Sequence, residues 1–322
     1  MEYIYNRRNS ICEEEKAGMD IRFVSRDAVD FPAKLRDIPG APKGIYVVGK
    51  LPDRDRPSVA IIGARICSEY GRSMACRFGA ELGRAGIQII SGMARGIDGI
   101  SQTAALKEGG VSFGILGCGV DVCYPKENLE LYHMLQKNGG LISEYEPGSQ
   151  PLARQFPARN RIISGLADAV IVIEAKQKSG TQITVDMALE QGREVYVIPG
   201  RLTDPLSEGC NHLIKQGAGI ILSPEQLLQE LLPEFQAQSE HLKTAKNRGI
   251  NCDEILKNKE KNNFVLDKEE DMVYASIDLY AKNLEDIVGK LNIPIQELTH
   301  ILLSLELKGL IKEVGKNHYV RL

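Results

Sequence analysis

The sequence lacks the motifs that mark the commonest ATP-hydrolysing and zinc sites. No G-x-x-x-x-G-K-[ST] loop occurs, which argues against a P-loop ATPase. The seven cysteines include no C-x-x-C pair and no Cys/His cluster with zinc spacing, so we expect no metal site. Several cysteines, among them Cys76 and Cys118, fall in apolar runs, and we expect reduced core thiols, which favours a cytoplasmic protein.

Long apolar runs and an excess of one charge are also missing. No run approaches the length of a membrane span and the N-terminus is charged, so we predict neither an anchor nor a signal peptide. The formal net charge is -3, so any nucleic-acid site must be a local basic patch. The 322 residues, 43% of them hydrophobic, suffice for a large core and favour two domains.

Strand-like runs alternate with helix-like segments between residues 58 and 222. The runs are rich in Ile and Val and mostly non-alternating, which is typical of strands buried on both faces of a parallel sheet. Repeated strand–helix units predict right-handed crossovers and an extended Rossmann-like, doubly wound, mainly parallel sheet. Ligands of such sheets bind beyond the carboxyl ends of the strands. The runs are 59–62, 87–90, 112–116, 141–144, 169–174, 194–198 and 219–222.

Composition divides the chain into four segments. Residues 1–50 form an N-terminal extension and lead-in, with an edge strand at 45–48, and residues 51–235 form the Rossmann-like domain. Residues 236–268 are polar and charged, as in a linker. Helical spacing followed by a hairpin predicts a winged-helix domain over 269–322.

The first turn of the sheet departs from the dinucleotide-binding pattern. That pattern is G-x-G-x-x-G, and its second glycine lets a pyrophosphate reach the backbone. Here the turn reads Gly63-Ala-Arg65, which places a guanidinium where that glycine would be. The second strand ends in Ser91-Gly92 without the acidic residue that would hold a ribose, and Asp98 comes too late in the chain for that role. The turn therefore suits a phosphate met by arginine rather than NAD.

Three further loops follow strands at the same predicted edge. In Ser91–Asp98 the glycines and the following helix present backbone N–H groups to an anion, and Asp98 caps or orders the loop. A later loop brings Tyr124 and Lys126 to this face, and Lys178–Thr181 enters a helix with the Ser/Thr/Gly chemistry of an anion site. A lone Gly-rich turn is usually only a turn, but four on one edge indicate a site.

A predicted helix start carries Phe156, Arg159, Asn160 and Arg161. These residue types suit phosphate contacts by the arginines and an aromatic platform for a base. The alternative is that one arginine ties down the loop and that Phe156 packs in the core. The sequence leaves both interpretations open.

Several segments, in order, resemble the DNA-processing protein A (DprA/Smf) family. They include SGMARGID, LGCGVDVCYP, FPARNRIISGLADAVIVIEA, SGTQIT, GREVYVIPG and GCNHLIKQGA. The resemblance covers about Asp20–Leu232, and the tail resembles that family's winged-helix domain. It implies a cytoplasmic single-stranded DNA-binding protein that protects incoming DNA and loads the RecA recombinase in natural transformation. It implies no membrane, no metal, no ATP or other cofactor, and no enzymatic activity.

The strand-end loops and the resemblance together give a predicted set of residues. Ala64 replaces the serine common in the family between the glycine and the arginine, which removes one hydroxyl from the turn. The family also implies a homodimer, for which we predict contacts at Leu189, Leu213 and Ile214, unless these three only pack against the sheet. The predicted DNA contacts are Gly63, Arg65, Ser91, Gly92, Arg95, Gly96, Lys126, Phe156, Arg159, Asn160, Arg161, Ser179, Gly180 and Thr181.

Two other functions are consistent with parts of the pattern. The first is a nucleotide hydrolase of the lysine-decarboxylase-like type, but its loop carries a glutamate, and here no acid follows Ser179–Thr184 before Asp186. The second is a winged-helix transcription regulator. The third tail helix, Pro294–Lys308, has only one terminal cation, Lys308, whereas a major-groove reader needs Arg, Lys, Asn or Gln on that face. Its other polar side chains include Gln296, Glu297, His300 and Glu306. We therefore predict protein contact or weak DNA contact for the tail.

Overall fold

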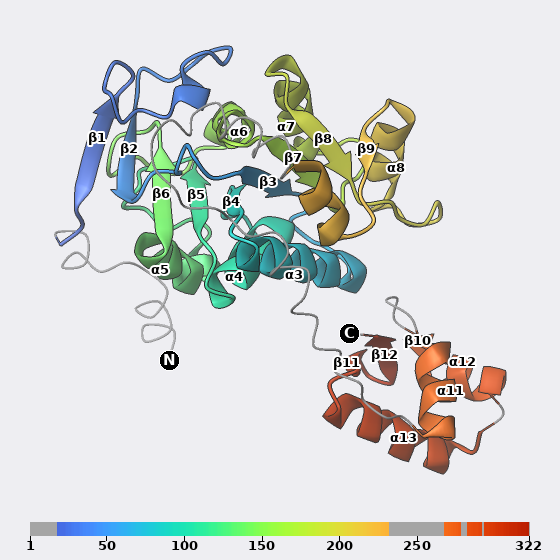
Figure 1. Cartoon of the computed structure of the whole chain (residues 1–322). Coiled ribbons are helices and arrows are strands. Elements are labelled where there is room, and N and C mark those ends of the chain that lie inside the picture. The colour runs from blue at the N-terminus through green and yellow to red at the C-terminus, as the bar shows by residue number, and fades with distance from the viewer. Residues whose placement is uncertain (1–17, 232–266, 278–281, 292, 322) are drawn as a thin grey trace. The chain divides into compact units, whose positions relative to one another are not determined.

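The computed structural model describes residues 18–231, 267–277, 282–291 and 293–321, which belong to a sheet domain and a C-terminal domain (Figure 1). Of the predicted linker, residues 236–266 lie outside the described residues, as do the first 17 residues of the lead-in. Among the described helices, none combines the length and the apolar character that a membrane crossing requires.

The sheet domain is built on one mixed sheet in which parallel pairing dominates. Its strand order is β1-β2-β6-β5-β4-β3-β7-β8-β9. All neighbours from β6 to β9 in that order pair in parallel, whereas β1 and β2 add antiparallel pairs at one end. The predicted doubly wound, mainly parallel architecture is confirmed. The strands are β1 Ile21–Ser25, β2 Gly44–Gly49, β3 Ser58–Ile62, β4 Gln88–Ser91, β5 Ser112–Leu116, β6 Gly139–Ser143, β7 Ala169–Val172, β8 Glu194–Val197 and β9 Gly219–Ile220.

Residues 45–48 form a strand as predicted, but its predicted place at the edge of the sheet is wrong. These residues lie in β2, which pairs with β6 on one side and with β1 on the other. The edge strand is β1, whose sequence IRFVS mixes polar and apolar residues and so carries no buried-strand signal. The lead-in therefore contributes two strands to the sheet, and its Val24, Ile45 and Val47 lie in the same core cluster as Ile62 and Val172.

Helices cover both faces of the sheet, with α3, α4 and α5 on one face and α6 and α7 on the other (Figure 1). Because α3 follows β3 and α7 follows the adjacent β7, chains leave these two neighbouring strands toward opposite faces. This divergence is the switch point at which doubly wound sheets bind ligands. The helices are α3 Glu69–Arg84, α4 Ile97–Lys107, α5 Leu129–Lys137, α6 Gln155–Leu166, α7 Gly180–Glu190 and α8 Glu208–Lys215, with short 3-10 turns η1 Ala33–Leu35 and η2 Lys126–Asn128.

The cysteines of the described residues are free thiols, and not all of them are buried. Cys118 is in the core as predicted, and burial raises its pKa to about 12, so it stays protonated at neutral pH. The prediction of a core position for Cys76 is wrong, because Cys76 is exposed on α3 while Phe78 and Leu82 form the buried face of that helix.

The C-terminal domain has the predicted winged-helix arrangement. Its helices are α11 Lys268–Ser276, α12 Leu284–Leu291 and α13 Ile295–Leu307, and the strands are β10 Lys282–Asn283, β11 Ile311–Gly315 and β12 His318–Arg321. Val273, Ile287 and Leu302 are buried together in its core. Lys308, the one cation predicted for the third helix, lies 2.6 Å from Glu270 Oε2 and is neutralised by it. The prediction of protein contact or weak DNA contact for the tail stays a prediction, and this pairing leaves the helix without a free cation at that end.

Candidate nucleic-acid interface

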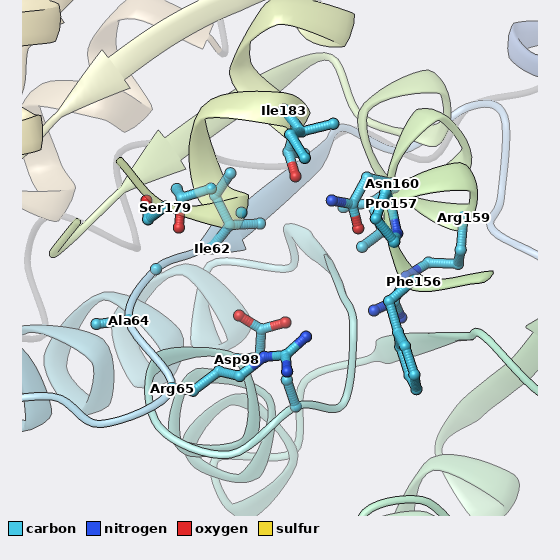
Figure 2. A pocket seen from close by; sticks show the side chains of 16 residues that line it. Ile62, Ala64, Arg65, Asp98, Phe156, Pro157, Arg159, Asn160, Ser179 and Ile183 are labelled. Carbon is cyan, nitrogen blue, oxygen red and sulfur yellow. The ribbon is translucent and has the colours of Figure 1, made fainter. Parts of the chain in front are cut away.

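A cavity of about 410 Å³ lies where β3 and β7 end (Figure 2). Its walls come from the turn after β3, from the first turn of α7, from α6, and from Ala94 and Asp98 near the start of α4. The predicted residues that line it are Gly63, Arg65, Phe156, Arg159, Asn160, Ser179, Gly180 and Thr181. The predicted residues that do not line it are Ser91, Gly92, Arg95, Gly96, Lys126 and Arg161.

Arg65 is the available cation of the cavity. Its side chain is exposed and makes no hydrogen bond or ion pair with any described residue. The guanidinium carbon lies 5.7 Å from the centroid of the Phe156 ring, within the range of a cation–π contact. Arg65 therefore has its charge free for an anion and its position fixed by an aromatic neighbour.

Phe156 lies at the rim of the cavity rather than in the core. The residue is partly exposed, and its ring is 5.3 Å from the ring of Tyr124, which is 43% exposed. On the inner side the Arg159 guanidinium lies 5.9 Å from the same ring. The alternative of a core Phe156 is thus wrong, and two neighbouring aromatic rings are accessible beside the cation Arg65.

Arg159 ties down the loops beneath the cavity, which is the alternative that the sequence left open. It is 4% exposed, and its Nη1 donates to Gly92 O at 3.0 Å and also to Ile115 O. Burial lowers its pKa to about 10, which leaves it charged at neutral pH. The prediction of a direct phosphate contact by Arg159 conflicts with this burial, because the guanidinium is committed to backbone carbonyls.

Asp98 orders the Ser91–Asp98 loop, as predicted. Its Oδ2 accepts a hydrogen bond from the Gly92 N–H at 3.0 Å, while Arg159 holds the Gly92 carbonyl. A Cβ at Gly92 would lie 2.7 Å from Asp98 Oδ2 and 2.8 Å from Arg159 Nη2. Position 92 therefore has no room for a side chain between Asp98 and Arg159, which hold the Gly92 backbone. Burial raises the pKa of Asp98, and the nearby Arg159 charge opposes that rise.

Gly96 joins the second loop to the first. Its φ is 72°, and a Cβ there would overlap Ala64 O and lie 2.7 Å from Arg65 O. Replacing Gly96 by alanine should therefore lower the free energy of unfolding by more than the roughly 1–3 kcal/mol typical of left-handed strain alone. Urea unfolding of the parent protein and of Gly96→Ala measures this difference in unfolding free energy.

Gly109 supplies the matched control for Gly96. It has a φ of 77°, but nothing lies within 4 Å of the Cβ that alanine would add. Gly109→Ala should therefore show the cost of the backbone conformation without the collision. Equal losses of unfolding free energy in Gly96→Ala and Gly109→Ala would contradict the close contact between the two loops.

Ser91 and Arg161 have structural partners. Ser91 is buried, and its Oγ donates to Ile61 O at 2.6 Å, so the prediction of a DNA contact is wrong for this side chain. Arg161 is partly buried, with Nη2 2.7 Å from both carboxylate oxygens of Glu144 and Nε 2.8 Å from Gly40 O. It attaches the lead-in to α6, and this commitment conflicts with a predicted phosphate contact.

Arg95 and Lys126 are exposed beside the cavity rather than in it. Arg95 forms an ion pair with Glu127, and the Arg95 side chain is 61% exposed. Lys126 opens η2, two residues after the rim residue Tyr124. Both side chains are exposed, and the charge of Arg95 is offset by that of Glu127.

The structure divides the predicted dimer contacts. Leu213 is 3% exposed and packs in the core of the sheet domain. It is therefore not available to a partner subunit. Ile214 is partly buried against the same core, and Leu189 is 60% exposed on α7. Only the last of the three is a fully presented apolar side chain.

Apolar wall residues are the part of the site that sequence reasoning missed. Ile163 and Ile183 line the cavity from α6 and α7, and Ile183 is 38% exposed there. Helical periodicity gave no reason to separate them from ordinary core residues. Among the described residues, no group of three or more His, Cys, Asp or Glu side chains is arranged to hold a metal ion.

Comparison with known proteins gives matches across both domains. Residues 22–232 match the family described as DNA recombination-mediator protein A, and residues 257–315 match the DprA winged helix domain. The DNA processing protein DprA of Streptococcus pneumoniae is 43% identical over 200 residues, which are 62% of this chain and 71% of that protein. Protein Smf of Escherichia coli is 35% identical over 322 residues, which cover 98% of this chain and 80% of that protein.

Two solved structures share the fold and a substantial part of the sequence. The X-ray structure of DprA from Streptococcus pneumoniae has a TM-score of 0.62 at 41% identity and covers 66% of this chain and 74% of its own. A Helicobacter pylori DprA structure, described by its single-stranded DNA binding mode, has a TM-score of 0.61 at 30% identity and covers 68% of this chain and 98% of its own. The family matches span both domains, and they agree with the order of motifs in the sequence. The chain therefore belongs to the DNA recombination-mediator protein A (DprA/Smf) family, a family of recombination mediators rather than enzymes.

Proposed function

We propose that this protein binds single-stranded DNA at the carboxyl edge of its sheet. The observation that carries the proposal is the free guanidinium of Arg65 beside the accessible rings of Phe156 and Tyr124. Single-strand binders combine cations that follow the phosphates with aromatic faces on which bases stack. The binding of single-stranded DNA named for the Helicobacter pylori relative supports the same interpretation.

The layout of the side chains suggests a path for the strand. A phosphate meets Arg65 at the cavity, and a base stacks on the Phe156–Tyr124 pair at the rim. Lys126 then lies outside the cavity, where it attracts the backbone through longer-range charge, whereas Glu127 offsets the charge of Arg95. Because the rim offers aromatic faces and few amides, binding should show little sequence preference.

Replacing Phe156 by alanine tests the stacking surface. We expect a loss of about 1–3 kcal/mol in binding free energy for oligothymidylate and a similar loss for mixed sequences. Thermal stability should change little, because the ring is partly exposed. Fluorescence anisotropy measures the affinity, with duplex DNA as the competitor.

Phe23→Ala is the matched control for that substitution. Phe23 is 56% exposed on β1, at the far edge of the sheet, so its loss removes an exposed ring without touching the cavity. Single-strand affinity should be unchanged. A Phe156→Ala protein that loses thermal stability but binds normally once folded would assign the ring to packing and remove it from the interface.

The cellular role follows from the family and is likewise a proposal. A protein that holds single strands in the cytoplasm can protect incoming DNA and load RecA during natural transformation. The direct experiment is formation of RecA filaments on single-stranded DNA with and without this protein. Normal strand binding with no effect on filament formation would reduce the role to strand protection.

We also propose that the active form is a homodimer. The exposed Leu189 on α7 and the half-buried Ile214 on α8 supply the apolar surface that a partner copy can cover. Two copies hold a longer strand, and the second contact forms at a high effective concentration. Sedimentation of the intact chain measures this association.

A further inference from the structure

The first turn of α7 has polar groups without partners. Ser179 is the N-cap residue of α7, but its hydroxyl makes no capping bond, and its Oγ is buried with no partner among the described residues. No described group accepts a hydrogen bond from the N–H of Gly180 or Thr181. Unclaimed donors at a helix N-terminus favour an anion, because the helix dipole is positive at that end.

Two arginines that line the same cavity also carry hydrogen-bond donors without partners among the described residues. Arg65 is unpaired, and Arg159, although 4% exposed, lines the cavity with an Nε that has no partner among the described residues. Figure 2 shows Arg65 and Asp98 below the opening, Ser179 and Ile183 opposite them, and Asn160 to one side. Positive charge thus approaches the cavity from two elements.

The acid of the cavity offsets little of this charge. Asp98 is the one carboxyl among the lining residues, and its Oδ2 already accepts the Gly92 N–H. The neighbouring Arg159 charge favours the ionised form of Asp98 and compensates part of its repulsion of an anion. Two guanidinium groups and a helix terminus therefore face a single, partly compensated carboxylate, a balance that suits a doubly charged ligand.

The remaining walls are apolar and limit the size of the occupant. Pro157, Ile163 and Ile183 line the cavity together with Phe156. The volume of about 410 Å³ lies toward the lower end of the roughly 300–1,000 Å³ found for small-ligand sites. The space suits one nucleotide unit, with a polar end for phosphate and an apolar end for a base.

We propose that the cavity binds a nucleoside 5′-monophosphate group, with the phosphate monoester at the N-terminus of α7 opposite Arg65 and the base against Ile183 and Phe156. The group can belong to the 5′ end of a strand or to a free nucleotide. The strand-end form rests on the proposed single-strand binding, and the free-nucleotide form does not. The bound group is a dianion, whereas a phosphate inside a strand carries one charge.

The first experiment compares ligands that differ only at the phosphate. Calorimetry with dAMP, deoxyadenosine and inorganic phosphate should show binding of dAMP alone. Oligothymidylate with a 5′-phosphate should bind about tenfold more tightly than the same strand with a 5′-hydroxyl, as expected for added charge-assisted hydrogen bonds. A preference for the 5′-phosphate strand without dAMP binding would assign the site to strand ends, and dAMP binding without that preference would assign it to free nucleotides.

The second experiment removes one donor from the helix terminus. Gly180 is the first residue of α7, where proline fits a helix, and the φ of -138° and ψ of 161° at Ser179 suit a residue before proline. Gly180→Pro should abolish the roughly tenfold preference for the 5′-phosphate strand over the 5′-hydroxyl strand. Gly180→Ala keeps the N–H and adds a Cβ with nothing within 4 Å, so it should retain the preference for the 5′-phosphate strand.

The outcomes separate this inference from the proposed function. Equal binding of the two strands together with no binding of dAMP would overturn the inference while leaving single-strand binding intact. Binding of dAMP without binding of the 5′-hydroxyl strand would support the inference and contradict single-strand binding. Inorganic phosphate binding as tightly as dAMP would overturn recognition of the nucleoside. Ser179→Ala, which removes only a hydroxyl, repeats the strand comparison if the proline variant does not fold.

Discussion

Replacing Arg65 by alanine should weaken single-stranded DNA binding by about tenfold or more at low salt, because one charge-assisted phosphate contact is lost. Binding should weaken with salt at a log–log slope of about -0.7 for each phosphate contact. The slope of Arg65→Ala should therefore be flatter than that of the parent by about one contact. Anisotropy titrations over a range of salt concentrations measure the affinity and the slope together.

Arg84→Ala is the matched control for the charge change. Arg84 ends α3 and pairs with Glu108, and its side chain is 60% exposed, so its removal alters the net charge as Arg65→Ala does. It lies at the end of the helix away from the turn that carries Arg65. Equal effects of the two substitutions would mean that net charge, rather than a contact at the cavity, governs binding. An unchanged slope in Arg65→Ala would remove Arg65 from the interface.

The order of elements in the sheet domain was predictable because buried parallel strands leave a strong signal. Short, non-alternating apolar runs such as Val59–Ile62, repeated between helix-like segments, are typical of strands buried on both faces. The edge strand β1 was missed because its exposed positions interrupt the apolar run. The core cluster that Val24 joins is assembled from strands and helices far apart in the sequence. The local sequence pattern therefore predicted the central strands of the sheet but not the edge strand β1.

The candidate site was predictable to the level of the loop but not of the side chain. Motif position placed Arg65, Arg159 and Arg161 near one edge of the sheet, but it could not say which guanidinium is free. That depends on acceptors distant in sequence, such as Ile115 O for Arg159 and Glu144 for Arg161. Charge alone thus overestimates a binding site, because buried arginines use their donors on the protein itself.

Replacing Arg159 by alanine should destabilise the fold rather than act on DNA binding alone. Its loss leaves Gly92 O and Ile115 O without their donor and removes the compensating charge near Asp98. Breaking such a buried arrangement by deleting one partner costs about 3–5 kcal/mol of unfolding free energy. Urea unfolding at neutral pH measures the loss, and an unchanged midpoint would contradict the structural role of Arg159.

The pH dependence of that loss identifies the group on which Arg159 acts. Because the pKa of Asp98 is raised in the folded protein, deprotonation costs stability as the pH rises from its ordinary value of 3.8 through the folded value. Arg159 lowers that folded pKa, so its removal raises the pKa of Asp98 further. The difference in unfolding free energy between parent and Arg159→Ala should therefore be smaller in mild acid, where Asp98 is protonated, and should grow with rising pH. In Asp98→Asn, which keeps an oxygen acceptor for the Gly92 N–H, the effect of Arg159→Ala should lose this dependence. A loss that stays constant with pH in the parent background would leave the carbonyl hydrogen bonds as the whole contribution of Arg159.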